Sequence, residues 1–249
     1  MINGLPFKSK SFLSGFLVLF LMLSACTRMI LNSRATHARE LKVFEKDDQK
    51  VVYIGTTHLA KPSFFKEVRQ QVDSLRNEGF VFIKEGVSIK EGTSDKEVDT
   101  LRRKLRQLIG LTIGDYSNKE NKSLPKLYTS GDYIMQTDSL LGLNSTDKRV
   151  DLTYNEMIAA HEEKYGEIIL TECDWKTDLF DKYDCRDGNA YNQSFYVVDI
   201  LRTDLIVDYV LNTEAKKVAV IYGAGHFKWF YPDLIKNGYE YKNEKLNFR

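Results

Sequence analysis

The chain has 249 residues, of which 43% are hydrophobic, so it carries enough apolar material for one sizeable core. Its formal net charge is only +1, and it contains neither a basic run nor the spacing of a zinc knuckle. We therefore expect no nucleic-acid partner. No linker rich in proline, glycine or serine divides the chain, and we expect a single domain over residues 41–249.

The first 26 residues have the pattern of a bacterial lipoprotein leader. Two lysines and no acid precede an apolar run of about a dozen residues, which is shorter than the roughly 20 that a membrane span needs. This length predicts a signal peptide over residues 1–25. The sequence Leu-Ser-Ala-Cys at 23–26 resembles the lipobox, which places cleavage before Cys26 and a diacylglycerol on its sulfur. The alternative is a short transmembrane anchor with an incidental cysteine.

Lipidation of Cys26 would anchor the chain to a membrane of the bacterial cell envelope, because several acyl chains on one residue give stable attachment. Thr27 is not the aspartate that retains such proteins at the inner membrane, which favours the outer membrane if the organism has one. Residues 26–40 are then expected to form a tether between the lipid and the domain.

Strands and helices alternate over residues 41–112. The pattern predicts a hairpin, a helix with proline near its start, a strand that closes on Lys84 and Glu85, and an amphipathic helix that opens on a capping box. In chain order, these elements are the hairpin strands 41–45 and 51–55, the helix 61–79, the strand 80–86 and the helix 94–110.

The second half of the chain begins with a polar loop over 114–131. After it we expect a helical piece 133–142, a helix 152–166, a strand 167–172, a loop 174–191, a helix 192–212, a strand 217–223, a helix 229–238 and a strand 239–243. The helix over 192–212 is apolar almost all round, which predicts that it is buried. Alternation of strands and helices predicts an α/β fold with a central mixed sheet flanked by helices.

Two cysteines, Cys173 and Cys185, flank a polar and aromatic loop. Outside the cytoplasm they can form a disulfide, which requires Cα atoms within about 7 Å of each other. Two free thiols fit the sequence equally well. Because no Cys-x-x-Cys spacing occurs, neither a zinc site nor a redox motif is expected.

One local pattern occurs twice in the chain. In "VVYIGTTH" and again in "VAVIYGAGH", an apolar strand runs into Gly-x-x-His, followed by a helix, a glycine with an aromatic residue, and another strand. Such self-similarity predicts an internally duplicated strand–GxxH–helix–strand unit. Functional groups in open α/β sheets gather beyond the carboxyl ends of the strands, so we expect His58 and His226 to face one another across one cleft.

Three interpretations of the paired histidines remain open. Two imidazoles and a carboxylate can hold a divalent metal ion with an open position for water. A metal-free histidine and glutamate can instead transfer protons. In the third interpretation, the histidines only cap strand ends through ordinary hydrogen bonds.

These motifs resemble the TraB/GumN/Tiki family, within the superfamily of erythromycin-esterase-like and ChaN-like proteins. The resemblance covers about residues 50–241 and rests on "IGTTH", the glutamate that ends the next strand, an arginine in the helix before the last unit, and "GAGHFKWFYPDLIKNGY". It implies that His58, Glu85, Arg202 and His226 are catalytic or metal-binding groups. Relatives include metal-dependent peptidases, proteins linked to pheromone shutdown, esterases and haem binders.

The resemblance is incomplete at two positions. The family often continues the glutamate as Glu-Leu-Asp, whereas Gly86 and Val87 follow here, so a second acid is missing. Trp229 replaces a glycine that usually follows the last histidine by three positions, which would narrow the expected cleft. Arg202 has two interpretations, since it can point into the cleft or pair locally with Asp199, three residues earlier.

Two other polar residues have simpler explanations. His161 in "HEEKY" lacks the second histidine of a zinc helix, which predicts an exposed helix face. Asp151 could approach the cleft, although a helix N-cap explains it adequately.

The sequence supports three functional hypotheses. The first is an envelope lipoprotein whose metal-dependent hydrolase site, with His58, Glu85 and His226 as ligands of a divalent ion, cleaves a peptide or ester bond. The second is a non-catalytic module that sequesters a peptide, haem or another small ligand. The third is a structural lipoprotein with a vestigial site.

Overall fold

The computed structural model describes residues 35–112, 120–122, 126, 132–186 and 188–242, and a mixed six-stranded sheet lies at its centre. Its strands, in spatial order, are β6 (Lys148–Arg149), β4 (Val81–Lys84), β7 (Lys217–Gly223), β2 (Gln49–Thr56), β1 (Lys42–Lys46) and β8 (Glu240–Lys242). The first four run parallel, and β1 is antiparallel to both β2 and β8. A separate pair joins β3 (Leu59–Ala60) to β5 (Ile134–Met135).

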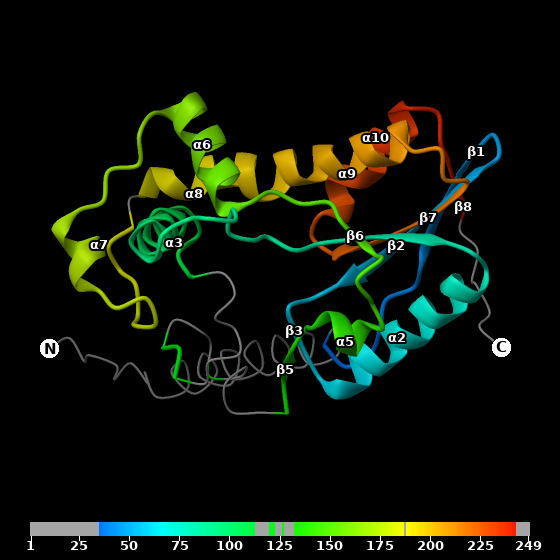
Figure 1. The fold of residues 1–249 in the computed structure, drawn as a ribbon, viewed down its shortest axis with the longest axis horizontal. Helices are drawn as coiled ribbons and strands as arrows, with labels where there is room; N and C mark the ends of the chain where they lie inside the picture. The colour runs from blue at the N-terminus through cyan, green and yellow to red at the C-terminus, as the bar shows by residue number, and fades with distance from the viewer. Residues whose placement is uncertain (1–34, 113–119, 123–125, 127–131, 187, 243–249) are drawn as a thin grey trace, which may run out of the picture.

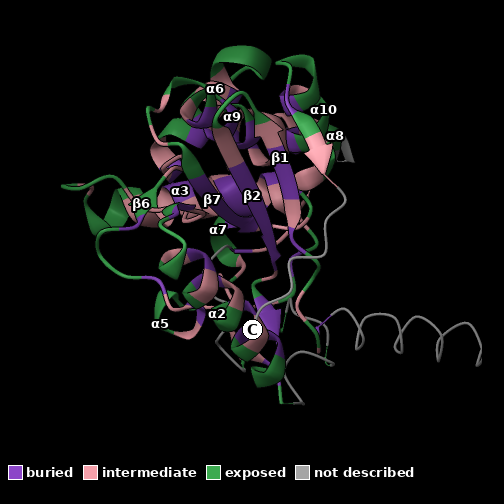
Figure 2. Cartoon of the chain, turned by 90° about the vertical axis from the view of Figure 1, so that its right-hand side faces the viewer, coloured by how far each residue is buried: buried purple, intermediate pink, exposed green. Residues whose placement is uncertain are grey.

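Helices cover both faces of this sheet, which confirms the predicted α/β class (Figure 1). The helices of the described residues are α2 (Pro62–Asn77), α3 (Asp95–Ile109), α5 (Asp138–Leu141), α6 (Tyr154–Tyr165), α7 (Glu172–Lys176), α8 (Gly188–Phe195), the π-helical turn η1 (Tyr196–Ile200), α9 (Leu201–Asn212) and α10 (Phe227–Lys236). Phe64, Val68 and Leu75 of α2 pack on one face, and Ile206 of α9 and Phe230 of α10 pack on the other. Between the helix layers, β2 and β7 are almost fully buried (Figure 2).

The two Gly-x-x-His units are both parallel strand–helix–strand crossovers. The first runs from β2 through α2 to β4 and passes over β7, whereas the second runs from β7 through α10 to β8 and passes over β2 and β1. Crossovers of one hand that travel in opposite directions place their helices on opposite faces of the sheet. The strand order therefore reverses between β2 and β7, and such a switch point is where open α/β sheets hold their ligands.

The long helix after residue 187 differs from its prediction. It begins at Gly188 rather than at 192, and a π-helical turn interrupts it at Tyr196–Ile200. It is not buried all round, because Asp204 and Asp208 lie on an exposed face while Val207 faces the core. The prediction that the whole helix is buried is wrong, because some of its apolar side chains lie on faces that are partly exposed.

The predicted strand over 167–172 is also wrong. Thr171 caps α7 instead, with a capping box in which its hydroxyl accepts from the Asp174 N–H and the Asp174 carboxylate accepts from the Thr171 N–H. Ile168 is buried against α3 and α6, but Ile169 is 72% exposed. The apolar run thus covers a cluster beside the sheet and adds no strand to it.

Part of the predicted tether is packed on the domain. Within the described residues 35–40, Ala35 is buried and its carbonyl accepts from the Lys61 N–H at 2.8 Å. The Ala38 N–H donates to the Glu67 carboxylate of α2 at 2.8 Å. Residues 1–34, including Cys26, lie outside the described part of the chain. Among the described residues, no helix combines the length and the apolar character needed to cross a bilayer.

Cys173 and Cys185 form a disulfide with Cα atoms 5.8 Å apart, inside the expected limit of about 7 Å. Replacing both cysteines with serine should lower the free energy of unfolding by about 2–4 kcal/mol, because the crosslink restricts the unfolded chain. Urea unfolding of the double variant and of the wild type measures this difference. Equal stabilities would show that the crosslink has no such role.

An arginine-centred site at the carboxyl ends of β2, β4 and β7

Strand register brings the predicted site residues to one edge of the sheet. Glu85 directly follows β4, and its N–H donates to the Ile221 carbonyl of β7 at 3.0 Å. His58 lies two residues beyond β2, and His226 follows β7 as the N-cap of α10. On the other side of β4, the Gly86 N–H donates to the Asp151 carboxylate at 2.8 Å. Parallel pairing therefore gathers these side chains where the strand order reverses.

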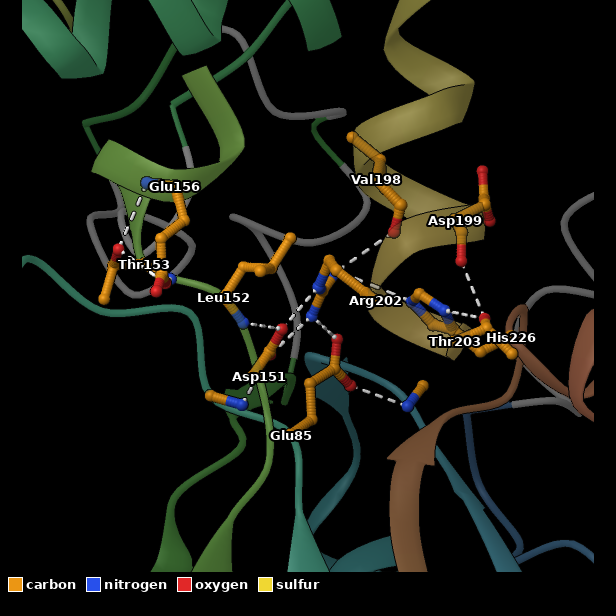
Figure 3. A network of polar contacts seen from close by, with 12 residues as sticks. Glu85, Asp151, Leu152, Thr153, Glu156, Val198, Asp199, Arg202, Thr203 and His226 are labelled. Atoms are coloured by element: carbon orange, nitrogen blue, oxygen red, sulfur yellow. Dashed lines mark hydrogen bonds and ion pairs between the residues drawn. The ribbon is translucent and has the colours of Figure 1, made fainter. Parts of the chain in front are cut away.

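Arg202 of α9 is the centre of the site, with a side chain only 5% exposed (Figure 3). Its Nε and Nη2 donate to the two carboxylate oxygens of Asp151 at 2.7 and 2.8 Å. Nη2 also donates to Glu85 Oε1 at 2.6 Å. Nη1 faces the Val198 carbonyl and His226 Nε2, both at 3.4 Å. The five N–H groups of a guanidinium each have an acceptor in this arrangement.

Backbone N–H groups complete the coordination of the two carboxylates. Glu85 Oε2 accepts from the Gly223 N–H at 2.6 Å, and Asp151 Oδ1 accepts from the Leu152 N–H at 2.8 Å. Burial alone would raise the pKa of Glu85, but the Arg202 guanidinium and the neighbouring histidines hold it below its usual value. Burial opposes ionisation of Asp151 as well, and its bonds to Arg202 outweigh it and lower the pKa. Both acids are therefore ionised at neutral pH. Together with the positive charge of Arg202, their two negative charges give the buried cluster a net charge of −1.

The hydrogen bonds around His226 define its tautomer. Thr203 Oγ1 donates its single proton to the Asp199 carbonyl at 2.7 Å, so it can only accept from His226 Nδ1, which lies 3.1 Å away. Nδ1 therefore carries the proton, and Nε2 presents a lone pair to Arg202. Burial and the Arg202 charge both lower the pKa of His226, which keeps the ring neutral.

His58 has a different environment from His226. Its side chain is 48% exposed, and its Nε2 lies 4.0 Å from Glu85 Oε1. This separation exceeds a hydrogen bond but permits an ion pair when the imidazole is protonated. His58 is thus the solvent-facing imidazole of the group, and Glu85 lies between it and the buried network.

The structure brings His58 and His226 to the same edge of the sheet as Glu85, but their observed positions do not fit ligands of one metal ion. Arg202 lies between His226 and Glu85, bonded to Glu85 and facing His226 Nε2. Both ring nitrogens of His226 already face partners, so its donor atoms do not fit the predicted ion as they stand. Accordingly, no set of three histidine, cysteine, aspartate or glutamate side chains among the described residues could hold a metal.

Of the two interpretations of Arg202, the local pair with Asp199 is wrong. Its local candidate Asp199 offers a backbone carbonyl to Thr203, whereas the carboxylate on Arg202 comes from Asp151, 51 residues away. Asp151 is not the helix N-cap that was proposed, because Thr153 caps α6. Asp151 therefore supplies a second acid next to Glu85 in the folded chain, although no acid directly follows Glu85 in the sequence.

One of two further residues differs from expectation. His161 is buried rather than exposed, and its ring lies 5.1 Å from that of Tyr165. Trp229 packs on Phe195 of α8, with ring centroids 4.9 Å apart. It thereby joins α10 to the end of α8, directly before η1.

The stability of the fold should decrease as the pH falls from about 7 toward 5. Burial lowers the pKa of both His226 and His161, with Arg202 adding to the effect at His226. Unfolded histidines bind a proton near pH 6.5, whereas these two stay neutral in the folded state to lower pH. The two neutral histidines therefore contribute their full stabilisation above about pH 6.5. Below about pH 6.5, the free energy of unfolding decreases by up to about 1.4 kcal/mol per pH unit for each histidine.

Urea unfolding at several pH values measures this dependence. His226→Gln should remove the contribution of one histidine to the slope, and His161→Gln should remove the other. A slope that is the same in wild type and His226→Gln would contradict the assignment of a neutral, buried His226.

No family model, no curated protein and no solved structure matches the chain.

Proposed function

We propose that the protein is a cell-envelope hydrolase that cleaves an ester or peptide bond, with His58 as general base. The observation that carries this proposal is the 4.0 Å separation between the half-exposed imidazole of His58 and the buried carboxylate of Glu85, which Arg202 holds in place. The switch point between β2 and β7 is the position at which such folds bind small molecules. Membership of the TraB/GumN/Tiki family is part of this proposal and is supported by the motifs around these residues.

In the proposed reaction, His58 accepts a proton from a water molecule whose oxygen attacks the carbonyl carbon of the substrate. The imidazolium then returns the proton to the departing alcohol or amine, so that one water is consumed and acid and leaving group are released. Glu85 stabilises the positive charge on His58 in between, because it belongs to a cluster with a net charge of −1. General acid–base catalysis of this kind contributes about 10²–10⁴-fold to a rate.

A metal-dependent form of the same hydrolase is a second proposal, and it requires a rearrangement of the site. Arg202 would have to release Glu85 and turn away from His226 before these residues and His58 could bind a divalent ion. When bound, such an ion would activate water near neutral pH. The three side chains present do not fit it in their observed positions.

A non-catalytic binding module is a further candidate, and the cavity beside η1 favours it. About 520 Å³ of space adjoins η1, whose Val198 carbonyl faces Arg202 Nη1. A protein that sequesters a peptide or another small ligand, such as haem, would use this space without needing a base at position 58. Absence of turnover together with ligand binding would support this alternative.

The proposed location is the bacterial envelope, with Cys26 lipidated and embedded in a membrane. The disulfide supports a compartment outside the cytoplasm, where such bonds persist. Mass spectrometry of the mature N-terminus should find a diacylated Cys26 and no residues 1–25. An unprocessed chain that begins at Met1 would contradict the proposal, and a Cys26→Ser variant provides the unlipidated control.

Hydrolysis by purified full-length protein tests the proposed function. Matched aryl esters and fluorogenic peptides should be supplied at pH 7.5, with and without a chelator. Release of product that saturates with substrate concentration supports a hydrolase, and the faster series identifies the bond. Failure of both series at enzyme concentrations that detect a hundredfold acceleration over buffer would remove the hydrolase proposal.

A further inference from the structure

A cavity of about 520 Å³ lies beside the arginine-centred site, within the size range of small-molecule pockets. The residues that line it are Ile109, Arg186, Asn192, Ser194, Phe195, Val198, Asp199 and Lys228. Val198 and Asp199 belong to η1, and their carbonyls accept from Arg202 Nη1 and Thr203 Oγ1 (Figure 3). The cavity and the site therefore share one turn of helix.

The charges on the cavity wall favour an anionic ligand. Arg186 and Lys228 come from different segments of the chain, and Asp199 is the only acid among the lining residues described. The Lys228 ammonium lies 5.2 Å from the ring centroids of both Phe195 and Trp229, which holds it at the cavity. The described wall thus has a formal charge of +1.

The remaining lining residues add apolar surface next to these cations. Ile109, Phe195 and Val198 present hydrocarbon, and Asn192 and Ser194 supply an amide and a hydroxyl. A ligand that uses both kinds of surface has an apolar group adjacent to a negatively charged one. Among the substrates of an ester or peptide hydrolase, this describes a molecule that ends in a carboxylate beside an apolar side chain or acyl chain.

The position of Arg186 is fixed by the fold. It directly follows Cys185, whose disulfide to Cys173 closes the preceding loop. Its Nη2 donates to the Leu108 carbonyl near the end of α3. Because the disulfide restrains the backbone before Arg186 and the Leu108 carbonyl holds its guanidinium, less conformational entropy would be lost when it binds an anion.

We propose that this cavity binds the carboxylate end of the substrate, with Lys228 and Arg186 as the groups that recognise the charge. This inference deepens the proposed function and rests on it, because it assigns the substrate class of the same site. The carboxylate could belong to a peptide C-terminus or to a fatty acyl compound, and both share the required chemistry.

Calorimetric titration of the full-length protein tests the inference. The probes are an N-acetyl dipeptide that ends in leucine with a free carboxylate, the same dipeptide as its C-terminal amide, and decanoate. We expect the free acid to bind at least about tenfold more tightly than the amide, as removal of a charge-assisted hydrogen bond predicts. Binding by decanoate alone would identify an acyl source, and binding by the dipeptide acid alone a peptide source.

Two variants on the same helix make the test specific. Lys228→Met should weaken binding of the free acid about tenfold and leave the amide unchanged. Lys236→Met, at the exposed end of α10, is the matched control and should bind like the wild type. Three results would each overturn the inference: measurable binding of the dipeptide acid and its amide with equal affinity, no binding of any carboxylate probe, or a Lys228→Met variant that binds its carboxylate probe as tightly as the wild type.

His58→Gln separates this inference from the proposed function. If the wild type binds the carboxylate probes through Lys228 but neither protein hydrolyses any substrate, the proposed hydrolase fails and the carboxylate site stands. If the wild type hydrolyses esters or peptides without preferring a carboxylate, the hydrolase stands and the assignment of the cavity fails.

Discussion

Replacing Arg202 with methionine should lower the free energy of unfolding by about 3–5 kcal/mol, the usual cost of removing one partner from a buried ion pair. Asp151 and Glu85 are both almost fully buried, and each accepts a hydrogen bond from the guanidinium. Without that cation, two carboxylates would face one another in a site of low polarity. Urea unfolding at pH 7.5 measures the loss.

Arg69→Met is the matched control for this experiment. Arg69 forms an exposed pair with Asp73 at 3.8 Å, and such surface pairs contribute at most about 1 kcal/mol. A second variant, Arg202→Met with Glu85→Gln and Asp151→Asn, removes both negative charges and should recover part of the lost stability. A loss below about 1 kcal/mol in Arg202→Met would show that the network does not hold the site together.

Replacing His58 with glutamine should reduce kcat/KM for hydrolysis by about 10²–10⁴-fold, because glutamine can donate and accept hydrogen bonds but cannot transfer a proton. Stability should change little, since the side chain is 48% exposed. The effect should appear in kcat more than in KM, because proton transfer belongs to the chemical step. Steady-state kinetics on the better of the two substrate series provides the measurement.

His37→Gln is the control for His58. His37 also forms an exposed pair with a glutamate, Glu67 at 2.9 Å, but it lies near the start of α2 and away from the network. It should leave both kinetic constants unchanged. If His58→Gln retains activity within twofold of the wild type, His58 is not the general base. This conclusion holds whether or not the substitution changes the stability of the fold.

The sequence predicts every strand of the central sheet except β6, and most helices, because their patterns are local. Apolar runs such as 217–223 allow no other element of that length, and Ser94 and Thr153 cap the helices that follow them. The strand expected over 167–172 fails for a physical reason. An apolar run signals burial, but it does not distinguish packing against helices α3 and α6 from pairing in a sheet.

The site is predictable only in part. The repeated Gly-x-x-His pattern identifies His58 and His226, and the end of a strand identifies Glu85. For Asp151, the cleft is only one of two interpretations that the sequence allows, and Thr203 is not identified at all. Their roles depend on the register of β6 beside β4 and on the π-helical turn before Arg202. Because a helix N-cap explained Asp151 locally, its partner Arg202, 51 residues away, could not be identified from the sequence.

The central claim is that Arg202 occupies the middle of a site in which His58 and Glu85 act without a metal ion. Metal content and hydrolysis by one purified sample, before and after chelation, test it most directly. The account predicts well below one metal ion per chain and an unchanged kcat/KM after chelation. Loss of hydrolysis on chelation, with recovery after one equivalent of a divalent metal ion per chain is added, would contradict it.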